Sequence, residues 1–584
     1  MKKYSLILIF SLLSLALHQA PRSYAVAEAP SFGSGITTCA APVLPVVLTS
    51  PTVVTDCTRA GLQAALNQGG QITFDCGPVQ ITISIGATLE LNPTVDTVID
   101  GGGLVTLDGL GQVRILHKDW HDPALGPVTL TLQNIRLVNG KAPFDYAQGK
   151  PSGSGTGDHS GGALAAGYSA TRVHIINATF ENNSTRETAI PDNQGGAIFV
   201  HNAAETVISG SVFSGNLAGN GGAFGGIATG LVIANSRFTA NQAVDASPGG
   251  IVRGYGGAIH LDGVNPDLPF DLAQGKPGYA GNNNRVSVCG SVFEDNVAQR
   301  GGGALSVVIS DAKGTKATYE KSTFTGNRVL GVDGSFGQGG AIYHIEDDHA
   351  GGDAEDNLEI GYNTFHANQA LRQGGAAWLY ILGRGRVVNT TFEGNSTSAP
   401  FNTVGQGGAM VITLGKIDIV NTVFANNHAA YQAGALHGGG DGDPQRVITL
   451  SNTIFLNNTL NEQDLPSETK WQGYHTNRPM LDGGQNIQYP RFKPTYNNEV
   501  NNNITPQPIY TDPMLAALGD NGGPTLTMAL LPTSPAINQG SPLACPDDDQ
   551  RGFVRNDPCD IGPFEYGGAA VSLDHLLWLP VAYK

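Results

Sequence analysis

The chain has 584 residues, of which 79 are Gly and only 14 % are charged, so that Gly is about twice as frequent as usual and charge is scarce. Gly is a poor helix former and follows no triplet period here, which excludes a helical bundle and collagen and favours β structure with many tight turns. The net charge of -17 repels phosphate backbones, and no Lys/Arg cluster offsets it, so we expect no nucleic-acid partner.

Residues 1–27 have the three regions of a secretory signal peptide. Two lysines precede an apolar run from Leu6 to Leu17, and small residues follow up to Ala27. A run of about twelve residues is short of the roughly 20 that a membrane-spanning helix needs, so we expect no transmembrane span in the mature chain. We therefore predict export to the cell envelope, as a secreted or cell-surface protein, with a linker over 28–50.

The segment 51–140 is predicted to hold an N-terminal cap and the first coils of a repetitive fold. The pattern from Thr58 to Asn67 predicts a short amphipathic helix that starts at Asp56 or Thr58 and stops at Gly69-Gly70. Such a helix would close the open end of the core. The strands expected after it are Gln71–Phe74, Val79–Ile85, Thr97–Asp100 and Val128–Val138.

The six cysteines fit an oxidising compartment. Two pairs lie close in sequence and are the predicted disulfides: Cys57 with Cys76, and Cys545 with Cys559. The first pair would fasten the predicted helix to the first strand. The sequence leaves Cys39 and Cys289 unassigned.

A two-part repeat occupies 141–460. Its first half is Gly-Gly-Ala followed by alternating apolar residues, and it begins at Gly161, Gly195, Gly221, Gly256, Gly302, Gly339, Gly374 and Gly407, with the variant Ala433-Gly434-Ala435. Its second half is a strand that ends in Phe-x-x-Asn, with the Asn at Asn183, Asn216, Asn241, Asn296, Asn327, Asn368, Asn395, Asn427 and Asn458. The two halves alternate without a break.

This repeat predicts an all-β fold, a right-handed parallel β-helix (solenoid) with a short N-terminal capping helix and a C-terminal irregular or β extension. Stacked coils would place Phe on Phe inside. The repeated Asn would adopt left-handed φ at one corner and join neighbouring coils as an amide ladder. Gly-Gly would serve a second corner where no Cβ fits. We therefore assign these residues to the rod itself and not to catalysis.

Two segments interrupt the repeat, at 143–151 and 269–277, and they match at eight of nine positions. They are interpreted as copies of one inserted loop. Because a loop that leaves the side of a solenoid costs its core little, a tolerated insertion is favoured over a dedicated binding loop.

After Asn458 the repeat stops, and 461–566 is predicted to be a separate C-terminal region. It carries, in this order, Asp520-Asn521-Gly522-Gly523-Pro524-Thr525, Ser534-Pro535-Ala536-Ile537-Asn538-Gln539-Gly540, Asp549-Gln550-Arg551-Gly552 and Cys559-Asp560-Ile561-Gly562-Pro563-Phe564-Glu565. Together these motifs resemble the choice-of-anchor Q domain, which is found at the C-terminal end of exported bacterial β-helix proteins. The apolar tail 567–584 is either an unfamiliar sorting tail or a last strand that packs on the rod.

The Gly-Gly-Ala and Phe-x-x-Asn repeats likewise resemble those of the polymorphic outer membrane proteins, the chlamydial surface proteins and adhesins. Both resemblances imply an exported protein that is secreted or displayed at the cell surface or cell outer membrane.

Pectate-lyase-like enzymes share the expected fold, so two outward-facing columns were searched for acids. The first is Phe199, Gly225, His260, Ser306, Tyr343, Trp378, Val411 and His437, and the second is His201, Ile227, Asp262, Val308, Ile345, Tyr380, Thr413 and Gly439. Polysaccharide hydrolysis needs two facing carboxylates, and lyase chemistry needs a base with Ca²⁺ held by carboxylates. No such cluster occurs in these columns, so we predict no catalytic residues and no metal site.

Three aromatic residues are the candidate binding site: Tyr343, Trp378 and Tyr380. Exposed aromatics in register on a rigid sheet can stack on sugar rings, unless an adjacent loop covers them. The acidic stretch from His344 to His349 is the one candidate for Ca²⁺, but it lacks a calcium-loop spacing. We therefore favour a solvated turn there and predict no cofactor.

The sequence thus predicts a non-catalytic exported β-helix that acts in adhesion, in contact with glycans or other cell-surface components, or in envelope structure. The alternative is a polysaccharide lyase or glycoside hydrolase on a pectate-lyase-like β-helix. A third interpretation is a subunit of an envelope layer. The oligomeric state is not predicted.

Overall fold

The computed structural model describes residues 39–119, 126–142, 159–166, 171–185, 193–244, 253–264, 285–310, 315–332, 336–347, 356–399, 405–438, 446–461, 473–493 and 500–570. Three predicted features lie outside these residues: the signal peptide, the two inserted loops and the tail from residue 571.

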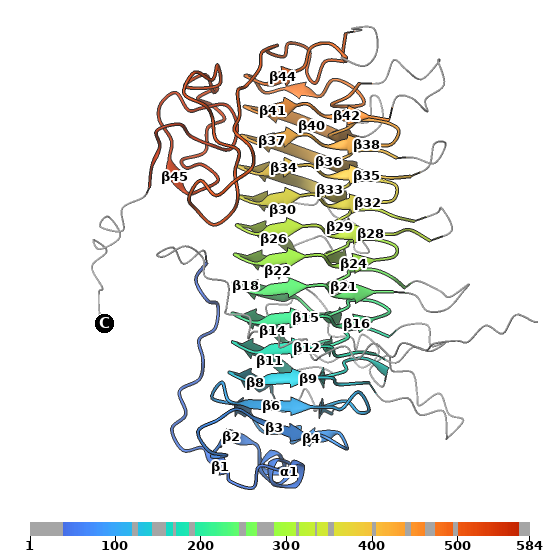
Figure 1. The fold of residues 1–584 in the computed structure, drawn as a ribbon, viewed down its shortest axis with the longest axis vertical. Helices are drawn as coiled ribbons and strands as arrows, with labels where there is room; N and C mark the ends of the chain where they lie inside the picture. The colour runs from blue at the N-terminus through green and yellow to red at the C-terminus, as the bar shows by residue number, and fades with distance from the viewer. Residues whose placement is uncertain are drawn as a thin grey trace, which may run out of the picture.

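The N-terminal end of the core is closed by helix α1 (Arg59–Gln68), as predicted (Figure 1). The hydroxyl of Thr58 accepts a hydrogen bond from the amide of Gly61 and caps the first turn, and Gly69 ends the helix at φ 72°. The helix buries Leu62 and Leu66 against the first coils. The disulfide between Cys57 and Cys76 joins the start of α1 to the end of strand β2.

The first face of the rod is a stack of parallel strands, most of which follow the Gly-Gly-Ala motif. They are β4 (Leu89–Leu91), β7 (Leu116–Lys118), β10 (Leu164–Ala166), β13 (Ile198–His201), β17 (Phe224–Ile227), β21 (Ile259–Val264), β25 (Leu305–Ile309), β29 (Ile342–Glu346), β33 (Ala377–Val388), β36 (Met410–Val420) and β39 (Leu436–Gly438).

The second face joins the first into one sheet, because β33 and β36 run through both faces without a break. Its other strands are β1 (Thr52–Val54), β2 (Gly70–Phe74), β5 (Thr97–Asp100), β8 (Val128–Gln133), β11 (Thr171–Ile176), β14 (Glu205–Ser209), β18 (Leu231–Ala234), β22 (Arg285–Cys289), β26 (Lys316–Glu320), β30 (Asp356–Gly361), β40 (Arg446–Ser451) and β43 (Leu481–Asp482).

The third face is a separate parallel sheet that carries the Phe of each repeat. Its strands are β3 (Ile81–Ser84), β6 (Val105–Asp108), β9 (Arg136–Val138), β12 (Thr179–Glu181), β15 (Val212–Ser214), β19 (Arg237–Thr239), β23 (Val292–Glu294), β27 (Thr323–Thr325), β31 (Thr364–His366), β34 (Thr391–Glu393), β37 (Val423–Ala425), β41 (Ile454–Leu456) and β44 (Ile487–Tyr489).

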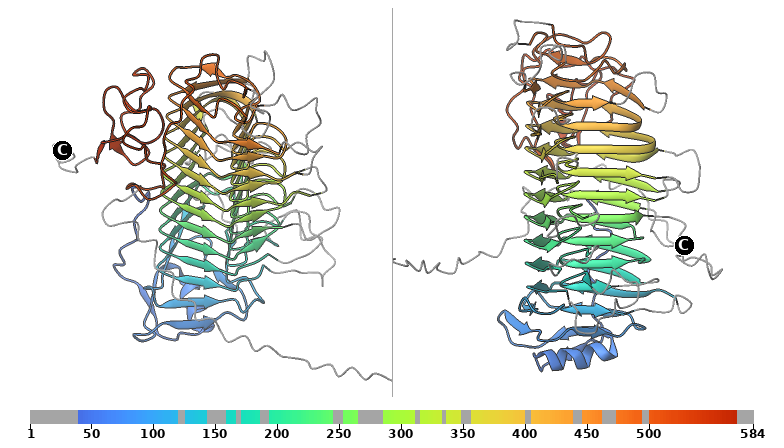
Figure 2. Two further views of the ribbon diagram at one scale, coloured as in Figure 1. Left: turned by 45° about the horizontal axis from the view of Figure 1, so that its top comes forward. Right: turned by 90° about the vertical axis from the view of Figure 1, so that its right-hand side faces the viewer.

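In the described part of the chain, a further parallel sheet of eight strands, each only two residues long, closes the repeat coils after the third face. It contains β16 (Leu217–Ala218), β20 (Gln242–Ala243), β24 (Val297–Ala298), β28 (Arg328–Val329), β32 (Gln369–Ala370), β35 (Ser396–Thr397), β38 (His428–Ala429) and β42 (Thr459–Leu460). Both views in Figure 2 show the coils stacked along one axis. Three long all-parallel sheets confirm the predicted parallel β-helix, while its right-handed winding stays a prediction.

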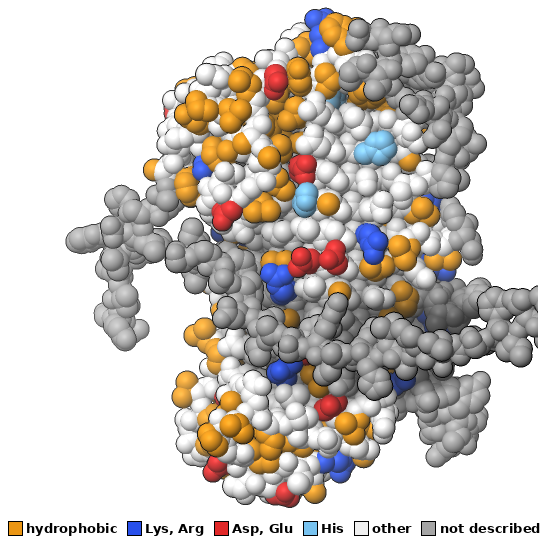
Figure 3. Space-filling model, in the orientation of Figure 1, with side chains coloured by type: hydrophobic (Ala, Val, Ile, Leu, Met, Phe, Trp, Pro, Cys, Tyr) orange, Lys and Arg blue, Asp and Glu red, His pale blue; other side chains and the backbone are white. Residues whose placement is uncertain are grey.

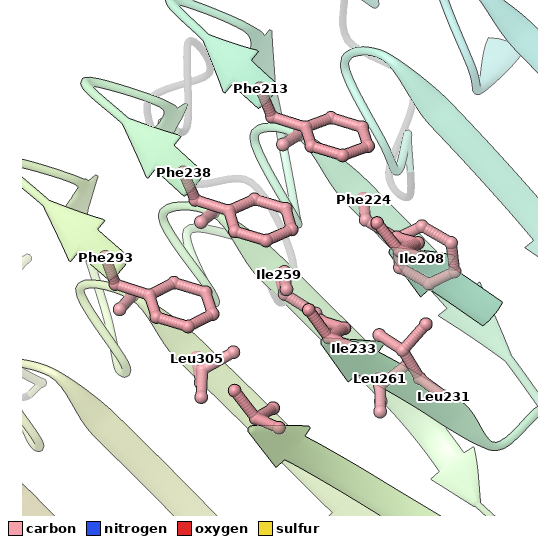
Figure 4. Packing of buried hydrophobic residues seen from close by; sticks show 14 of the residues in the cluster. Ile208, Phe213, Phe224, Leu231, Ile233, Phe238, Ile259, Leu261, Phe293 and Leu305 are labelled. Atoms are coloured by element: carbon pink, nitrogen blue, oxygen red, sulfur yellow. The ribbon is translucent and has the colours of Figure 1, made fainter. Parts of the chain in front are cut away.

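The core is built from columns of identical or similar side chains. The nine Phe rings from Phe180 to Phe455 are fully buried and stack with centroids 4.7 to 5.0 Å apart. This is the spacing of neighbouring strands, so each ring sits directly above the one in the coil below. Figure 4 shows three of them, Phe213, Phe238 and Phe293, in parallel planes.

The predicted asparagine ladder runs beside the Phe stack and is completely buried. In each step the side-chain amide of one Asn donates to the carbonyl oxygen of the Asn in the next coil, as from Asn241 to Asn296 at 2.9 Å. Its second N–H donates to the backbone carbonyl of a Phe in the preceding coil, as from Asn241 to Phe213. The backbone N–H of Asn241 also donates to Asn296. All the hydrogen-bonding groups of the amide are therefore used.

The prediction that these Asn residues have left-handed φ is wrong. The residue just before each one takes that conformation: Asn182, Gly215, Ala240, Asp295, Gly326, Ala367, Gly394, Asn426 and Asn457. Because the corner turns one residue earlier, the Asn itself keeps ordinary φ and aims its amide along the rod axis.

The Gly-Gly corner behaves as predicted. The first Gly of each pair has φ between 59° and 70°. At the second Gly the next coil lies too close for a side chain, since a Cβ on Gly303 would be 2.0 Å from the carbonyl oxygen of Gly340.

An N-terminal segment lies along the outside of the rod. Residues 39–50 run down beside the lower coils (Figure 1), held by the Cys39–Cys289 disulfide and by hydrogen bonds of Val46 with Gln133.

Near the C-terminal end of the rod, the coils continue past Leu460, where the sequence pattern stops, into β43 and β44. The pattern is lost because Gln488 replaces Phe in that coil and no Gly-Gly-Ala precedes it.

Residues 513–570, here called the C-terminal module, fold back onto the third face near its C-terminal end. Outward positions that are polar in the preceding coils become apolar there, as in the register columns Thr391, Val423, Ile454 and Glu393, Ala425, Leu456. These side chains form a second core with module residues Met528, Leu530, Ala536, Ile561 and Phe564. The Cys545–Cys559 disulfide and the short antiparallel pair β45 (Phe553–Val554) and β46 (Ala569–Ala570) lie within the module.

Candidate functional site

The first outward column has the predicted register, but four of its side chains are buried and not exposed: Phe199, His260, Ser306 and Val411. Gly225, His260, Ser306, Tyr343, Trp378, Val411 and His437 pair in this order from β17 to β39. The second column follows the prediction as far as Tyr380, which then pairs with Leu414 and not with Thr413. An extra residue in β36 shifts the register at this point.

Tyr343 and Trp378 stack on each other, with ring centroids 4.8 Å apart and planes 13° from parallel. Tyr343 also contacts Tyr255, at 5.5 Å between centroids. We call Tyr255, Tyr343 and Trp378 the aromatic row. Tyr380 lies two residues further along its strand, beside Ile345, and is outside the row.

Gly301 makes the contact between the two tyrosines possible. It occupies the coil between them, and a Cβ on Gly301 would be 3.0 Å from the ring of Tyr343 and 3.1 Å from that of Tyr255. The rings of Tyr255 and Tyr343 meet in the space that a side chain at position 301 would occupy.

The aromatic row is half-buried, whereas the sequence led us to expect exposed rings. Burial raises the pKa of the Tyr343 hydroxyl above its ordinary value, and the neighbouring Tyr255 adds to this. The indole N–H of Trp378 is shielded from solvent and has no hydrogen-bond partner among the residues that the structure describes. The row thus presents neutral rings at physiological pH.

A ladder of glutamines runs beside the row and was missed by the sequence analysis. Gln338, Gln373, Gln406 and Gln432, here called the glutamine ladder, pair in successive coils, directly before each Gly-Gly-Ala or its variant. The amide of Gln373 donates to Gln406 at 2.8 Å, and that of Gln406 donates to Gln432 at 3.4 Å. Nε2 of His437 lies 3.2 Å from the same Gln432 oxygen and ends the ladder. The repeated tetrapeptide Gln-Gly-Gly-Ala was the available signal.

The candidate calcium stretch is not a solvated turn at its start. His344 and Glu346 belong to β29 and point into the core, where both are fully buried. Nδ1 of His344 lies 3.0 Å from the hydroxyl of Tyr319, and its Nε2 lies 3.3 Å from Glu346. Glu346 also accepts the backbone N–H of Leu382. These groups are used within the core, and residues 348–355 lie outside the described part.

The described part of the chain offers no group of three or more His, Cys, Asp or Glu residues that could hold a metal ion. It also contains no helix with the length and hydrophobicity to cross a lipid bilayer. Seen from the side of Figure 1, charged side chains are scattered over the uncovered surface and form no field of one sign (Figure 3). The enzyme alternative therefore finds no support among the described residues.

Four charged motif residues of the C-terminal module are buried, Asp549, Arg551, Asp560 and Glu565, whereas Asp520 is exposed. Arg551 binds Asp549 at 2.6 Å, and Arg555 binds Glu565 at 3.1 Å. Arg555 also donates to the side chain of Asn389 on the rod, at 2.8 Å. The motifs thus fold the module and attach it to the coils.

Two comparisons with known proteins bear on the chain. A family model described as the Chlamydia polymorphic membrane protein (Chlamydia_PMP) repeat matches residues 177–201, which run from the end of β11 to the end of β13. No curated protein matches the chain.

Proposed function

We propose that this protein is an exported, surface-associated β-helix that contacts glycans through its first face and has no catalytic role. The aromatic row carries this proposal. Flat rings in register on a rigid sheet present a surface on which the apolar faces of sugar rings stack, and little entropy is lost because the rings are already ordered.

The surface location has two supports. The repeat match at 177–201 is to a family of membrane proteins, and the N-terminal sequence has the pattern of a secretory signal peptide. The three disulfides are compatible with an oxidising compartment outside the cytoplasm.

The C-terminal module is proposed to be a choice-of-anchor Q-like domain, on the resemblance of its motifs. Its role here would be to hold the start of the C-terminal tail against the rod.

A glycan array tests the proposal. The mature chain should bind a subset of glycans, and Trp378→Ala should reduce this binding at least 10-fold, because it removes half of the stacked pair. Tyr566→Ala is the matched control, since this Tyr is 38 % exposed but lies on the C-terminal module. The absence of any glycan binding, or binding that survives Trp378→Ala, would refute the proposed function.

A further inference from the structure

We propose that the aromatic row and the glutamine ladder form one binding track for an uncharged linear polysaccharide, which lies along the rod axis. This inference rests on the proposed function and specifies its ligand. It adds the four glutamines to the aromatic row.

The two columns are adjacent and in register. The ladder column starts at Tyr255, passes Gly301 and continues through the four glutamines. The neighbouring column holds Tyr343 and Trp378. From Tyr255 to Gln432 the track covers five steps of about 4.8 Å, or about 24 Å. A ligand that uses the whole track must therefore be a chain of several units.

The glutamine ladder is unsaturated, in contrast to the asparagine ladder. Gln373 and Gln406 each use one of two amide N–H groups, and among the described residues neither N–H of Gln338 or Gln432 has a partner. All four side chains are half-buried. The asparagine ladder is fully buried and uses every N–H. Within the described part of the chain, the track therefore presents a repeating set of donors that no other group uses.

The chemistry of the track selects an uncharged ligand. Neither column itself carries Asp, Glu, Lys or Arg between Tyr255 and His437. Among the described residues, the cations that reach the track do so at these two residues, Arg300 by a hydrogen bond with Tyr255 and Arg478 by its charge near His437. Burial lowers the pKa of His437 to about 4, so this ring is neutral at pH 7. Rings that stack, beside amides that donate to hydroxyl and ring oxygens, match the alternating apolar faces and polar edges of a neutral sugar chain.

Isothermal titration with purified hexasaccharides tests the inference. The probes are hexamers of β-1,4-linked glucose and of β-1,4-linked N-acetylglucosamine, with a galacturonate hexamer as the charged comparison. We expect a neutral hexamer to bind, with a dissociation constant that is insensitive to salt, and the galacturonate hexamer to bind at least 10-fold more weakly.

Substitutions separate the ladder from the row. Gln373→Leu and Gln406→Leu keep side-chain volume but remove the amide, and each should weaken binding about 3- to 10-fold, as for the loss of one hydrogen bond. Gln242→Leu is the control, because this exposed glutamine lies in β20, outside the track. Unchanged unfolding midpoints establish that each variant is folded.

The outcomes distinguish the two proposals. If Trp378→Ala abolishes binding while both glutamine variants bind as the wild type does, the ladder has no role and this inference is wrong although the proposed function stands. Preference for the galacturonate hexamer, or no binding of either neutral hexamer, also overturns it. Binding that resists Trp378→Ala refutes the proposed function and this inference together.

Discussion

His475 ends the asparagine ladder and makes the C-terminal end of the rod sensitive to acid. The last Asn of the ladder, Asn458, donates its amide to Nδ1 of His475 at 3.1 Å, so that this nitrogen must be unprotonated. The ring is fully buried and packs edge-on against Phe455. Burial lowers the pKa of His475 to about 3.

The sign of the resulting pH dependence follows from this pKa. The folded value lies below the ordinary 6.5, so the stability that a neutral His475 contributes is complete above about pH 6.5 and is lost as the pH falls towards 3. Between pH 7 and pH 4 this loss amounts to about 3 kcal/mol. Urea unfolding should show His475→Gln to be less stable than wild type at pH 7 and equal or more stable at pH 4. A difference that stays constant with pH would contradict this assignment.

At the residue scale the sequence predicts the asparagine ladder but not its end. The repeat of Phe-x-x-Asn is regular, so the stacking of like on like could be inferred. The residue with left-handed φ could not, because Asn, Gly, Ala and Asp all occupy that corner in different coils. His475 lies beyond the repeat, and only the fold brings it to Asn458.

At the element scale, Glu346 takes the place of a backbone carbonyl where two faces merge. Strand β33 continues from the first face into the second, whereas β29 ends at Glu346. The carboxylate accepts a hydrogen bond from the backbone N–H of Leu382, because β29 ends before any of its own carbonyl groups can reach this N–H. The carboxylate also lies 3.3 Å from Nε2 of His344. A buried carboxylate is tolerated here because these donors compensate its desolvation.

Removal of this carboxylate should therefore destabilise the rod. Glu346→Ala leaves the N–H of Leu382 and the ring of His344 without their acceptor, and should lower the free energy of unfolding by about 3 kcal/mol. Glu346→Gln, which keeps an acceptor oxygen, should cost less than half of that. Denaturant titration measures both, and equal losses would contradict this account, because Glu346→Gln keeps both the volume of the side chain and an acceptor oxygen for the N–H of Leu382.

The burial of His344 and Glu346 could not be predicted from the sequence, because these polar residues interrupt a column of inward-facing apolar residues. His344 and Glu346 stand beside further acidic residues, which favoured a turn, although the preceding Ile342 was correctly taken as inward. His344 and Glu346 can be buried because Tyr319 and Leu382, in two other coils, form hydrogen bonds with them. No local sequence pattern encodes these contacts.

At the scale of the whole molecule, the C-terminal module is a separate folding unit that packs against the rod. Its second core and the contact from Arg555 to Asn389 hold it to the third face. Sequence motifs located the module, but its docking site could not be predicted, because the signal is confined to two outward positions, where Thr391 gives way to Val423 and Ile454 and Glu393 to Ala425 and Leu456.

Substitution of Arg555 tests the contact between the module and the rod. Arg555→Met removes the partner of the buried Glu565 and the contact with Asn389, at a cost of about 3 to 5 kcal/mol. Limited proteolysis should then cut within 513–570 while the coils stay intact. Arg328→Met is the control, because this exposed arginine lies in β28, outside the module. Simultaneous digestion of module and coils would contradict a separable module.

The candidate site was half predicted. The outward column with Tyr343 and Trp378 followed from alignment of the coils on Gly-Gly-Ala, because strand periodicity fixes which residues share a face. Tyr255 was missed because it precedes its motif and reaches Tyr343 only across Gly301. The glutamines were treated as part of the corner, since their register is visible only once the coils are stacked.

The central claim is that the first face of this rod binds a neutral sugar chain along its axis. The most direct measurement is the dissociation constant of neutral oligosaccharides of increasing length, from two units upward, for the wild type and Trp378→Ala. The account predicts that affinity rises with length until the chain spans about 24 Å, the length of the track, and that Trp378→Ala removes this rise. Affinity that is independent of chain length, or the same length dependence in Trp378→Ala, would contradict it.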